Sequence, residues 1–188
     1  MKHTLKTALV LIIAIAFASF TTLKDKKVNV KDSTITWTGH KVTGQHDGTI
    51  TLKEGTLAFN GNTLVDGAFV MDMTTINTTD LKGNSKTKLD GHLKDDDFFG
   101  VNKFPTATLD FTKVEGQGPN YTVTGDLTIK GVTKPITFNM NVVEGTATAA
   151  FKIDRTKYGI KYGSSSFFDD LQDKAIYNEF DINATLKF

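Results

Sequence analysis

Apolar and polar residues alternate with a period of two along most of this chain. In the clearest run the apolar positions are Tyr121, Val123, Leu127 and Ile129, and the other face carries threonine, aspartate and lysine. Further alternating runs lie at 35–37, 50–52, 57–59, 69–73, 107–111, 136–142, 147–153 and 180–188. This alternation is typical of strands with one buried face, and turn-forming stretches such as Asn60-Gly61-Asn62 separate the runs. The pattern predicts about eight strands joined mostly by short loops.

One segment, Asp80–Phe99, interrupts the alternation. Within it Leu89 and Leu93 lie four residues apart. Because this spacing places two residues on the same face of a helix, we expect a short helix over about Ser85–Lys94 with a loop on each side. A second irregular stretch is expected at Ser164–Lys174.

The predicted strands have one apolar face each, which leaves a two-sheet sandwich or a closed barrel as the architecture. The long uniform strands and their meander-like connections favour the barrel. A barrel of about eight strands has an interior that its own side chains fill or that holds one small ligand. The sequence of 188 residues therefore predicts an all-β, single-domain, eight-stranded antiparallel barrel, with a helical insert that could cap one mouth.

The N-terminus is organised like a secretory signal. Lys2, His3 and Lys6 precede an apolar run that ends in Ala16-Phe17-Ala18, where small residues suit a signal peptidase. The apolar run is shorter than the roughly 20 residues that a membrane-spanning helix needs. We expect residues 1–18 to be a cleaved signal peptide, residues 19–27 a linker and residues 28–188 the barrel domain. The mature protein would be periplasmic or extracellular, without a stable membrane span.

Charge and cysteine content exclude several classes of function. Without residues 1–18 the chain has 20 Lys and Arg against 21 Asp and Glu, so its net charge is −1. This near-neutral balance argues against a nucleic-acid partner. The absence of cysteine excludes disulfides, thiolate metal sites and cysteine nucleophiles.

Histidines and aspartates are the first candidates for a metal or catalytic site. His40, His46 and His92 do not have the short spacing of zinc-binding pairs, so no metal site is expected. Asp95-Asp96-Asp97 lacks the spaced acidic pattern of a calcium loop. We interpret it as a solvated turn, after which Phe98-Phe99 enters the core.

Two further stretches carry polar groups of interest. Ser164-Ser165-Ser166 lacks the G-x-S-x-G context of a hydrolase nucleophile, and we interpret it as a loop. Asp154-Arg155 ends a strand, where it forms a structural ion pair or presents a cation to the head group of a ligand. The sequence leaves both interpretations open, and it designates no catalytic residue.

The apolar faces of the strands supply the candidate binding residues. Methionine is flexible and adapts to an irregular apolar ligand. We hypothesise that eight residues line an internal tunnel: Phe69, Met71, Met73, Leu109, Phe111, Phe138, Met140 and Phe151. Ordinary core packing is the alternative for each of them.

Several motifs occur in a fixed order along the chain. They include Ile35-Thr36-Trp37-Thr38-Gly39, Phe69-Val70-Met71-Asp72-Met73, Gly91-His92-Leu93-Lys94-Asp95-Asp96-Asp97-Phe98-Phe99, Val123-Thr124-Gly125-Asp126-Leu127-Thr128-Ile129 and Ile153-Asp154-Arg155-Thr156-Lys157-Tyr158-Gly159. Over about residues 28–188 the chain resembles the YceI family of exported, lipocalin-like proteins. The resemblance implies a lipocalin-like eight-stranded barrel that holds a polyisoprenoid, such as an isoprenoid quinone or a polyprenyl phosphate, and has no catalytic activity. It supplies no signature for the head group of the lipid.

Three functions follow from these observations. The first is carriage, storage or sequestration of a polyisoprenoid or other apolar lipid inside the barrel. The second is a hydrolase or isomerase that acts on a small lipophile, with His92 as the base. The third is a ligand-free structural module whose own side chains fill the barrel. No cofactor is expected, and a homodimer is left open.

Overall fold

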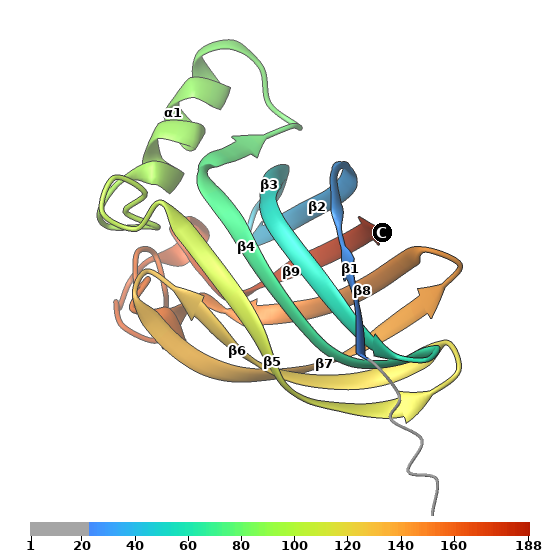
Figure 1. Cartoon of the computed structure of the whole chain (residues 1–188). Helices are drawn as coiled ribbons and strands as arrows, with labels where there is room; N and C mark the ends of the chain where they lie inside the picture. The colour runs from blue at the N-terminus through green and yellow to red at the C-terminus, as the bar shows by residue number, and fades with distance from the viewer. Residues whose placement is uncertain (1–22) are drawn as a thin grey trace, which may run out of the picture.

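The computed structural model describes residues 23–188, which Figure 1 shows as strands wrapped around a common interior. The strands are β1 (Leu23–Lys27), β2 (Asn29–Lys41), β3 (Gly44–Asn60), β4 (Thr63–Thr78), β5 (Thr106–Gln117), β6 (Asn120–Ile129), β7 (Val132–Val143), β8 (Thr146–Asp154) and β9 (Ile176–Lys187). The helix α1 spans Gly83–Lys94, and short 3₁₀ turns lie at Arg155–Tyr158 and Gln172–Lys174. The predicted signal peptide, residues 1–18, lies outside the described residues.

The strands β2 to β9 close into one antiparallel barrel. Their order is β3-β2-β9-β8-β7-β6-β5-β4, and β4 pairs again with β3 to complete the circle. All the pairings are antiparallel, from Ile35↔Ile50 between β2 and β3 to Ala68↔Asp110 between β4 and β5. The closed circle confirms the predicted eight-stranded barrel and excludes the two-sheet sandwich.

Strand β1 is an addition to this barrel. Its residues Leu23–Lys27 pair with Thr56–Asn60 of β3. Strand β2 pairs with the other end of β3, at residues 44–50. The sequence analysis placed these residues in a linker, and for them that prediction is wrong. Four of the five residues of β1 are charged, so the strand has no apolar alternation and is held by main-chain pairing.

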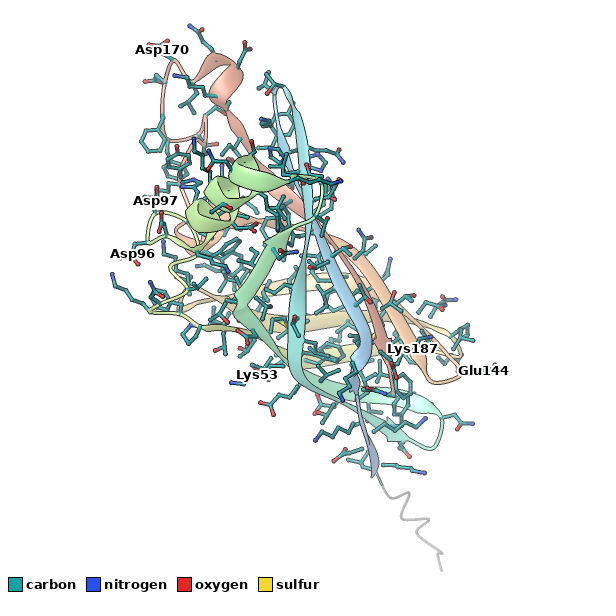
Figure 2. All side chains as sticks on the ribbon, turned by 90° about the horizontal axis from the view of Figure 1, so that it is seen from above. Lys53, Asp96, Asp97, Glu144, Asp170 and Lys187 are labelled. Atoms are coloured by element: carbon teal, nitrogen blue, oxygen red, sulfur yellow. The ribbon has the colours of Figure 1, made fainter. Side chains whose placement is uncertain are left out.

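The alternation of the sequence separates the interior of the barrel from its surface. Along β6, Tyr121, Val123, Leu127 and Ile129 are buried, as the pattern predicts. Figure 2 shows that charged side chains such as Lys53, Glu144 and Asp170 lie on the outside of the molecule, and these three residues are exposed. Within residues 23–188, no helix has the length and apolar character needed to cross a bilayer.

One end of the barrel is packed solid. Phe59 and Phe188 place their ring centroids 5.5 Å apart, and the main-chain N–H of Leu64 donates to the Tyr121 hydroxyl at 3.2 Å. Leu57 and Val123 are fully buried in the same region. This end therefore has an ordinary hydrophobic core, and it contains the β3–β4 and β5–β6 hairpins.

Helix α1 covers the opposite end of the barrel, as Figure 1 shows. The helix begins two residues before the predicted Ser85 and ends at Lys94 as predicted. Asp90 accepts the main-chain N–H of Thr78 at 2.7 Å, which fixes the helix to the end of β4. After the helix Asp95-Asp96-Asp97 is exposed and Phe98-Phe99 is buried, which confirms the interpretation of a solvated turn followed by core residues.

The barrel has a seam between β7 and β8. These two strands pair through only four residue pairs, from Val143↔Thr146 at the hairpin to Met140↔Ala149. Beyond that point the rings of Phe138 and Phe151 stack across the seam with centroids 4.6 Å apart. Side-chain packing thus replaces the hydrogen-bonded ladder along the rest of this contact.

Candidate functional site

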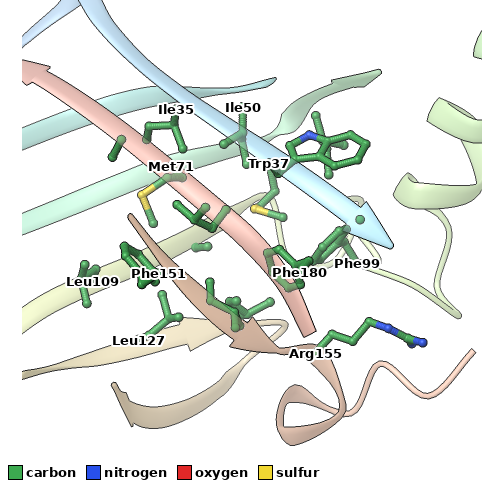
Figure 3. A pocket seen from close by; sticks show the side chains of 18 of the residues that line it. Ile35, Trp37, Ile50, Met71, Phe99, Leu109, Leu127, Phe151, Arg155 and Phe180 are labelled. Carbon is green, nitrogen blue, oxygen red and sulfur yellow. The ribbon is translucent and has the colours of Figure 1, made fainter. Parts of the chain in front are cut away.

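An apolar cavity of about 160 Å³ lies inside the barrel. Every strand from β2 to β9 contributes a side chain to its wall, and Leu93 of α1 covers it from above. Figure 3 shows Ile35, Met71, Leu109, Phe151 and other side chains converging on this space from different strands. The interior therefore joins a packed core at one end to a hollow at the other.

Seven of the eight predicted tunnel residues line the cavity. They are Phe69, Met71, Met73, Leu109, Phe138, Met140 and Phe151. Period-two alternation was a sufficient guide to them because their inward-facing positions keep the period of two, even at Met73, which adjoins a register shift between β3 and β4. Their contact with a ligand stays a prediction.

Phe111 is the exception, because it does not line the cavity. The register of β5 against β6 shifts between Phe111 and Lys113, and such a bulge bends the strand. The Phe111 ring packs against Phe69 and Phe138, with centroids 5.6 and 6.1 Å away. It also lies over Gly67, where a Cβ would be only 2.7 Å from the ring. Phe111 therefore supports the cavity wall from the packed side.

Trp37 is a wall residue that the sequence analysis did not select. It is the only tryptophan of the chain, it is 8% exposed, and its Nε1 donates to the carbonyl of Thr49 at 3.3 Å. Trp37 pairs across the strands with Gly48, where a Cβ would lie 2.2 Å from the indole. A glycine is thus required opposite the ring, and this pairing was not visible before the register was known.

Polar groups gather at the end of the cavity where β2 ends and β9 begins. His40, Tyr177 and Glu179 line this end together with Arg155, which follows β8. The register confirms the proximity, because Lys41 pairs with Ile176 and Asp154 pairs with Glu179. Tyr177 is 55% exposed, so the cavity reaches the surface here. This end is the mouth of the barrel.

Arg155 is held at the mouth by main-chain carbonyls. It is 2% exposed, and its Nε, Nη1 and Nη2 donate to the carbonyls of Tyr177, Ile160 and Ile176 at 3.0–3.1 Å. Burial lowers the pKa of the guanidinium, and the Asp154 carboxylate partly offsets this effect. Of the two interpretations that the sequence left open for Asp154-Arg155, the structural ion pair is not formed, because Asp154 accepts instead from the N–H and hydroxyl of Thr156.

A second charged cluster lies on the rim. The Asp181 carboxylate contacts His40 Nε2 at 2.6 Å and Lys152 Nζ at 2.9 Å. The hydrogen bond from His40 and then that from Lys152 hold the pKa of Asp181 below its usual range. Asp181 is therefore neutralised locally by its own partners.

His92 does not lie where a catalytic base would act on a bound lipophile. It is absent from the cavity wall, and its ring packs against Tyr162 and Phe98 with centroids 4.3 and 5.5 Å away. The ligand atoms of His92, Asp95 and Asp97 come within 4.8 Å of one another. Both aspartates are exposed, and such surface groups commonly occur without a metal ion. His92, the base that the hydrolase hypothesis named, is therefore not positioned at the cavity.

The size of the cavity limits what it accepts as it stands. Sites for drug-sized molecules begin at roughly 300 Å³, about twice the volume found here. A dry cavity of about 150 Å³ lined by aliphatic and aromatic residues is large enough for benzene. A longer ligand would therefore need wall side chains to move.

Comparison with known proteins gives two groups of relatives. A UPF0312 protein of Pseudomonas aeruginosa (strain LESB58) is 34% identical over 119 residues, which cover 51% of this chain and 60% of that protein. Protein YceI of Escherichia coli O6:H1 is 39% identical over 87 residues, which cover 42% of this chain and 45% of that protein. The chain thus spans between about half and three fifths of the length of these curated relatives.

Solved structures share the fold at lower sequence identity. BcnA of Burkholderia cenocepacia has a TM-score of 0.68 at 18% identity and covers 85% of this chain and 98% of its own. A domain from Saccharophagus degradans, described as polyisoprenoid binding and implicated in plant cell wall breakdown, has a TM-score of 0.61 at 14% identity. The match covers 88% of this chain and 97% of that domain. The family model of the YceI-like domain matches residues 27–188. The chain therefore belongs to the YceI-like family.

Proposed function

We propose that the protein binds one long apolar lipid, a polyisoprenoid, inside the barrel and carries, stores or sequesters it. The observation that carries this proposal is the apolar cavity. Side chains from all eight barrel strands line it, and it opens to the surface at the end where His40 and Tyr177 lie. Family membership and the likeness to the polyisoprenoid-binding domain of Saccharophagus degradans support the choice of ligand.

Solvent exclusion supplies the affinity in this proposal. A polyprenyl chain is insoluble, and burying a dozen methylene-sized groups contributes about 10 kcal/mol before ordering costs. Such binding needs few polar contacts. The chemistry requires no catalytic group, so the proposed function is that of a binding protein.

The cavity must widen to hold such a chain. Met71 and Met73 have flexible side chains that re-pack at low cost. The seam between β7 and β8 lacks ladder hydrogen bonds beyond Met140↔Ala149. In this proposal the stacked pair Phe138 and Phe151 parts when the chain enters, because no main-chain pairing must break there.

We propose that this function is exerted outside the cytoplasm, and the signal-like pattern of residues 1–18 supports this proposal. An exported carrier with a near-neutral surface would move a lipid between a membrane and the periplasm or the medium. Export stays a proposal. It is tested by N-terminal sequencing of the protein recovered from the periplasm, with cleavage expected after Ala18.

Native mass spectrometry of the purified protein tests the binding. We expect a complex with one lipid molecule, whose added mass disappears after extraction with organic solvent. Phe138→Asp places a charge in the cavity wall and should abolish retention. Asn139→Asp adds a charge on the adjacent, exposed position and should leave retention unchanged.

Two outcomes would overturn the proposal. One is a wild-type protein that carries no lipid and takes none up from vesicles that contain polyprenol. The other is a folded Phe138→Asp variant that retains lipid as well as the wild type does.

A further inference from the structure

The exposed aromatic side chains of the described residues all belong to one segment. Within residues 23–188 only four aromatic residues are exposed, each by 47–55%: Tyr162, Phe167, Phe168 and Tyr177. They lie between β8 and β9 and at the start of β9. Exposed apolar groups that gather at one place mark an interaction surface, whereas scattered ones do not.

This segment borders the mouth of the barrel. Tyr177 is exposed and also lines the cavity. Val42, an exposed residue of the β2–β3 hairpin, donates its N–H to the carbonyl of Ala175 at 3.2 Å. The Tyr162 ring packs on His92 of α1. We define the docking surface as Val42, Tyr162, Phe167, Phe168 and Tyr177.

A hydrogen-bonded turn presents the two phenylalanines. The carbonyl of Ser164 accepts the N–H groups of Phe167 and Phe168, both at 3.0 Å. Ser164 is fully buried, and its hydroxyl donates to Asn178 Oδ1 of β9 at 2.6 Å. The Asn178 amide donates in turn to the Ser166 hydroxyl at 2.8 Å. Strand β9 therefore anchors the turn, and the exposure of both rings is built into it.

The charges of this segment are balanced. It carries three exposed lysines and three exposed aspartates: Lys157, Lys161, Lys174, Asp169, Asp170 and Asp173. The segment therefore offers no strong attraction to a highly charged partner, and apolar contact must supply the affinity. The Lys161 ammonium lies 4.7 Å from the centroid of the Phe167 ring. A lysine that covers an apolar group and keeps its charge in water suits the head-group region of a bilayer.

The separation of the rings favours a bilayer over a protein partner. Among the described residues no ring contact joins any two of the four exposed aromatic residues, and the two tyrosines contact His40 and His92 instead. Protein interfaces depend on anchors that cluster in one packed contact. A bilayer has no fixed shape and accepts separate rings, and tyrosine is enriched at its surface.

We propose that the docking surface seats the mouth of the barrel on a zwitterionic phospholipid bilayer, with Phe167 and Phe168 among the head groups. Figure 2 shows Asp170, from the same loop, at one extremity of the molecule, far from Glu144 and Lys187, so a flat partner can reach the loop. This inference rests on the proposed lipid binding and names the place of exchange. A chain that passes from a docked bilayer into the cavity avoids crossing water.

Flotation with phosphatidylcholine vesicles tests the docking. Phe167→Ser combined with Phe168→Ser should lower the partition coefficient at least tenfold, about 1.4 kcal/mol. Val65→Thr combined with Val143→Thr removes two exposed apolar side chains far from the mouth and should leave it unchanged. Raising the salt from about 0.1 M to about 1 M should change wild-type binding less than about twofold, because the charges are balanced. Equal loss in both double variants would contradict the inference.

A single labelled cysteine distinguishes a bilayer from a second copy of the chain. The chain has no cysteine, so Ser165→Cys and the control Val143→Cys each accept one acrylodan label. Vesicles should shift the emission of the label at residue 165 to the blue, and lipids brominated in the acyl chain should quench it, with no change at residue 143. A blue shift that follows protein concentration without vesicles would show an interface between copies and overturn the inference.

Lipid retention separates this inference from the proposed function. Neither Phe167 nor Phe168 lines the cavity, so their double variant should retain lipid in native mass spectrometry as the wild type does. Wild-type protein that retains lipid but does not bind vesicles would refute only the docking. Wild-type protein that neither retains nor takes up lipid would refute the proposed function.

Discussion

Replacing Ala107 by Leu tests whether the interior of the barrel is a true cavity. Ala107 is 4% exposed on β5 and lines the cavity. Leucine adds three carbon atoms, which have room in a space of about 160 Å³. At about 0.8 kcal/mol for each buried methylene, the added atoms stabilise the fold by at most about 2.4 kcal/mol. The ordering of the leucine side chain costs about 0.5–1 kcal/mol, so we expect a net gain of about 1–2 kcal/mol.

Ala147 provides the matched control. It is also a buried alanine in a strand, but it is fully enclosed and does not line the cavity. Leucine at this position overpacks a filled region and should destabilise the protein by about 1–3 kcal/mol. The two variants therefore shift the free energy of unfolding in opposite directions, although the chemical change is the same.

Urea denaturation followed by the fluorescence of Trp37 measures both free energies, because this tryptophan lies in the cavity wall. Titration with an apolar fluorescent dye such as N-phenyl-1-naphthylamine then measures access to the cavity. Ala107→Leu should weaken dye binding tenfold or more, about 1.4 kcal/mol, because the leucine occupies the space of the ligand. If Ala107→Leu destabilises the protein as much as Ala147→Leu and leaves dye affinity unchanged, the interior is filled and the reasoning fails.

Two other predictions concern stability. Gly48→Ala should lower the free energy of unfolding by about 1–3 kcal/mol, because the new methyl meets the indole of Trp37 and the carbonyl of Asn77 at 2.2 Å. The same clash should displace the indole, so an unshifted emission maximum of Trp37 would contradict this prediction. Asp181→Asn should destabilise the protein at neutral pH. Because His40 and Lys152 lower the pKa of Asp181 in the folded protein, its contribution to stability is present above the ordinary aspartate pKa of 3.8 and is lost as pH falls through the lower folded pKa. The stability difference between Asp181→Asn and the wild type should therefore shrink in acid, and a constant difference in urea denaturation from pH 7 to pH 2 would contradict it.

Alternation predicted the interior of the barrel well because burial on one face is a property of each strand by itself. Val123 and Leu127 face inward on β6, and Phe138 and Met140 do so on β7, as their spacing indicated. Phe111 obeys the same alternation but adjoins a bulge, whose position depends on the pairing of two strands. A one-strand pattern cannot report such a shift.

Features that depend on pairing or on distant carbonyls were not visible in the sequence. Strand β1 contains Leu23 and four charged residues, and only its hydrogen bonds to β3 make it a strand. The seam joins β7 and β8, which alternate as regularly as their neighbours. The sequence identified Arg155 as a candidate for head-group binding, but its three carbonyl partners come from residues 160–177 and required the fold.

The methyl resonances of methionine test the central claim most directly. Three of the four methionines, Met71, Met73 and Met140, line the cavity from β4 and β7, and the fourth, Met1, lies outside the described residues. In protein labelled with ¹³C at the methionine methyl groups, addition of a polyprenol should shift all three cavity signals, because the chain passes between them. If the polyprenol binds and all three signals stay in place, the lipid is not inside the barrel.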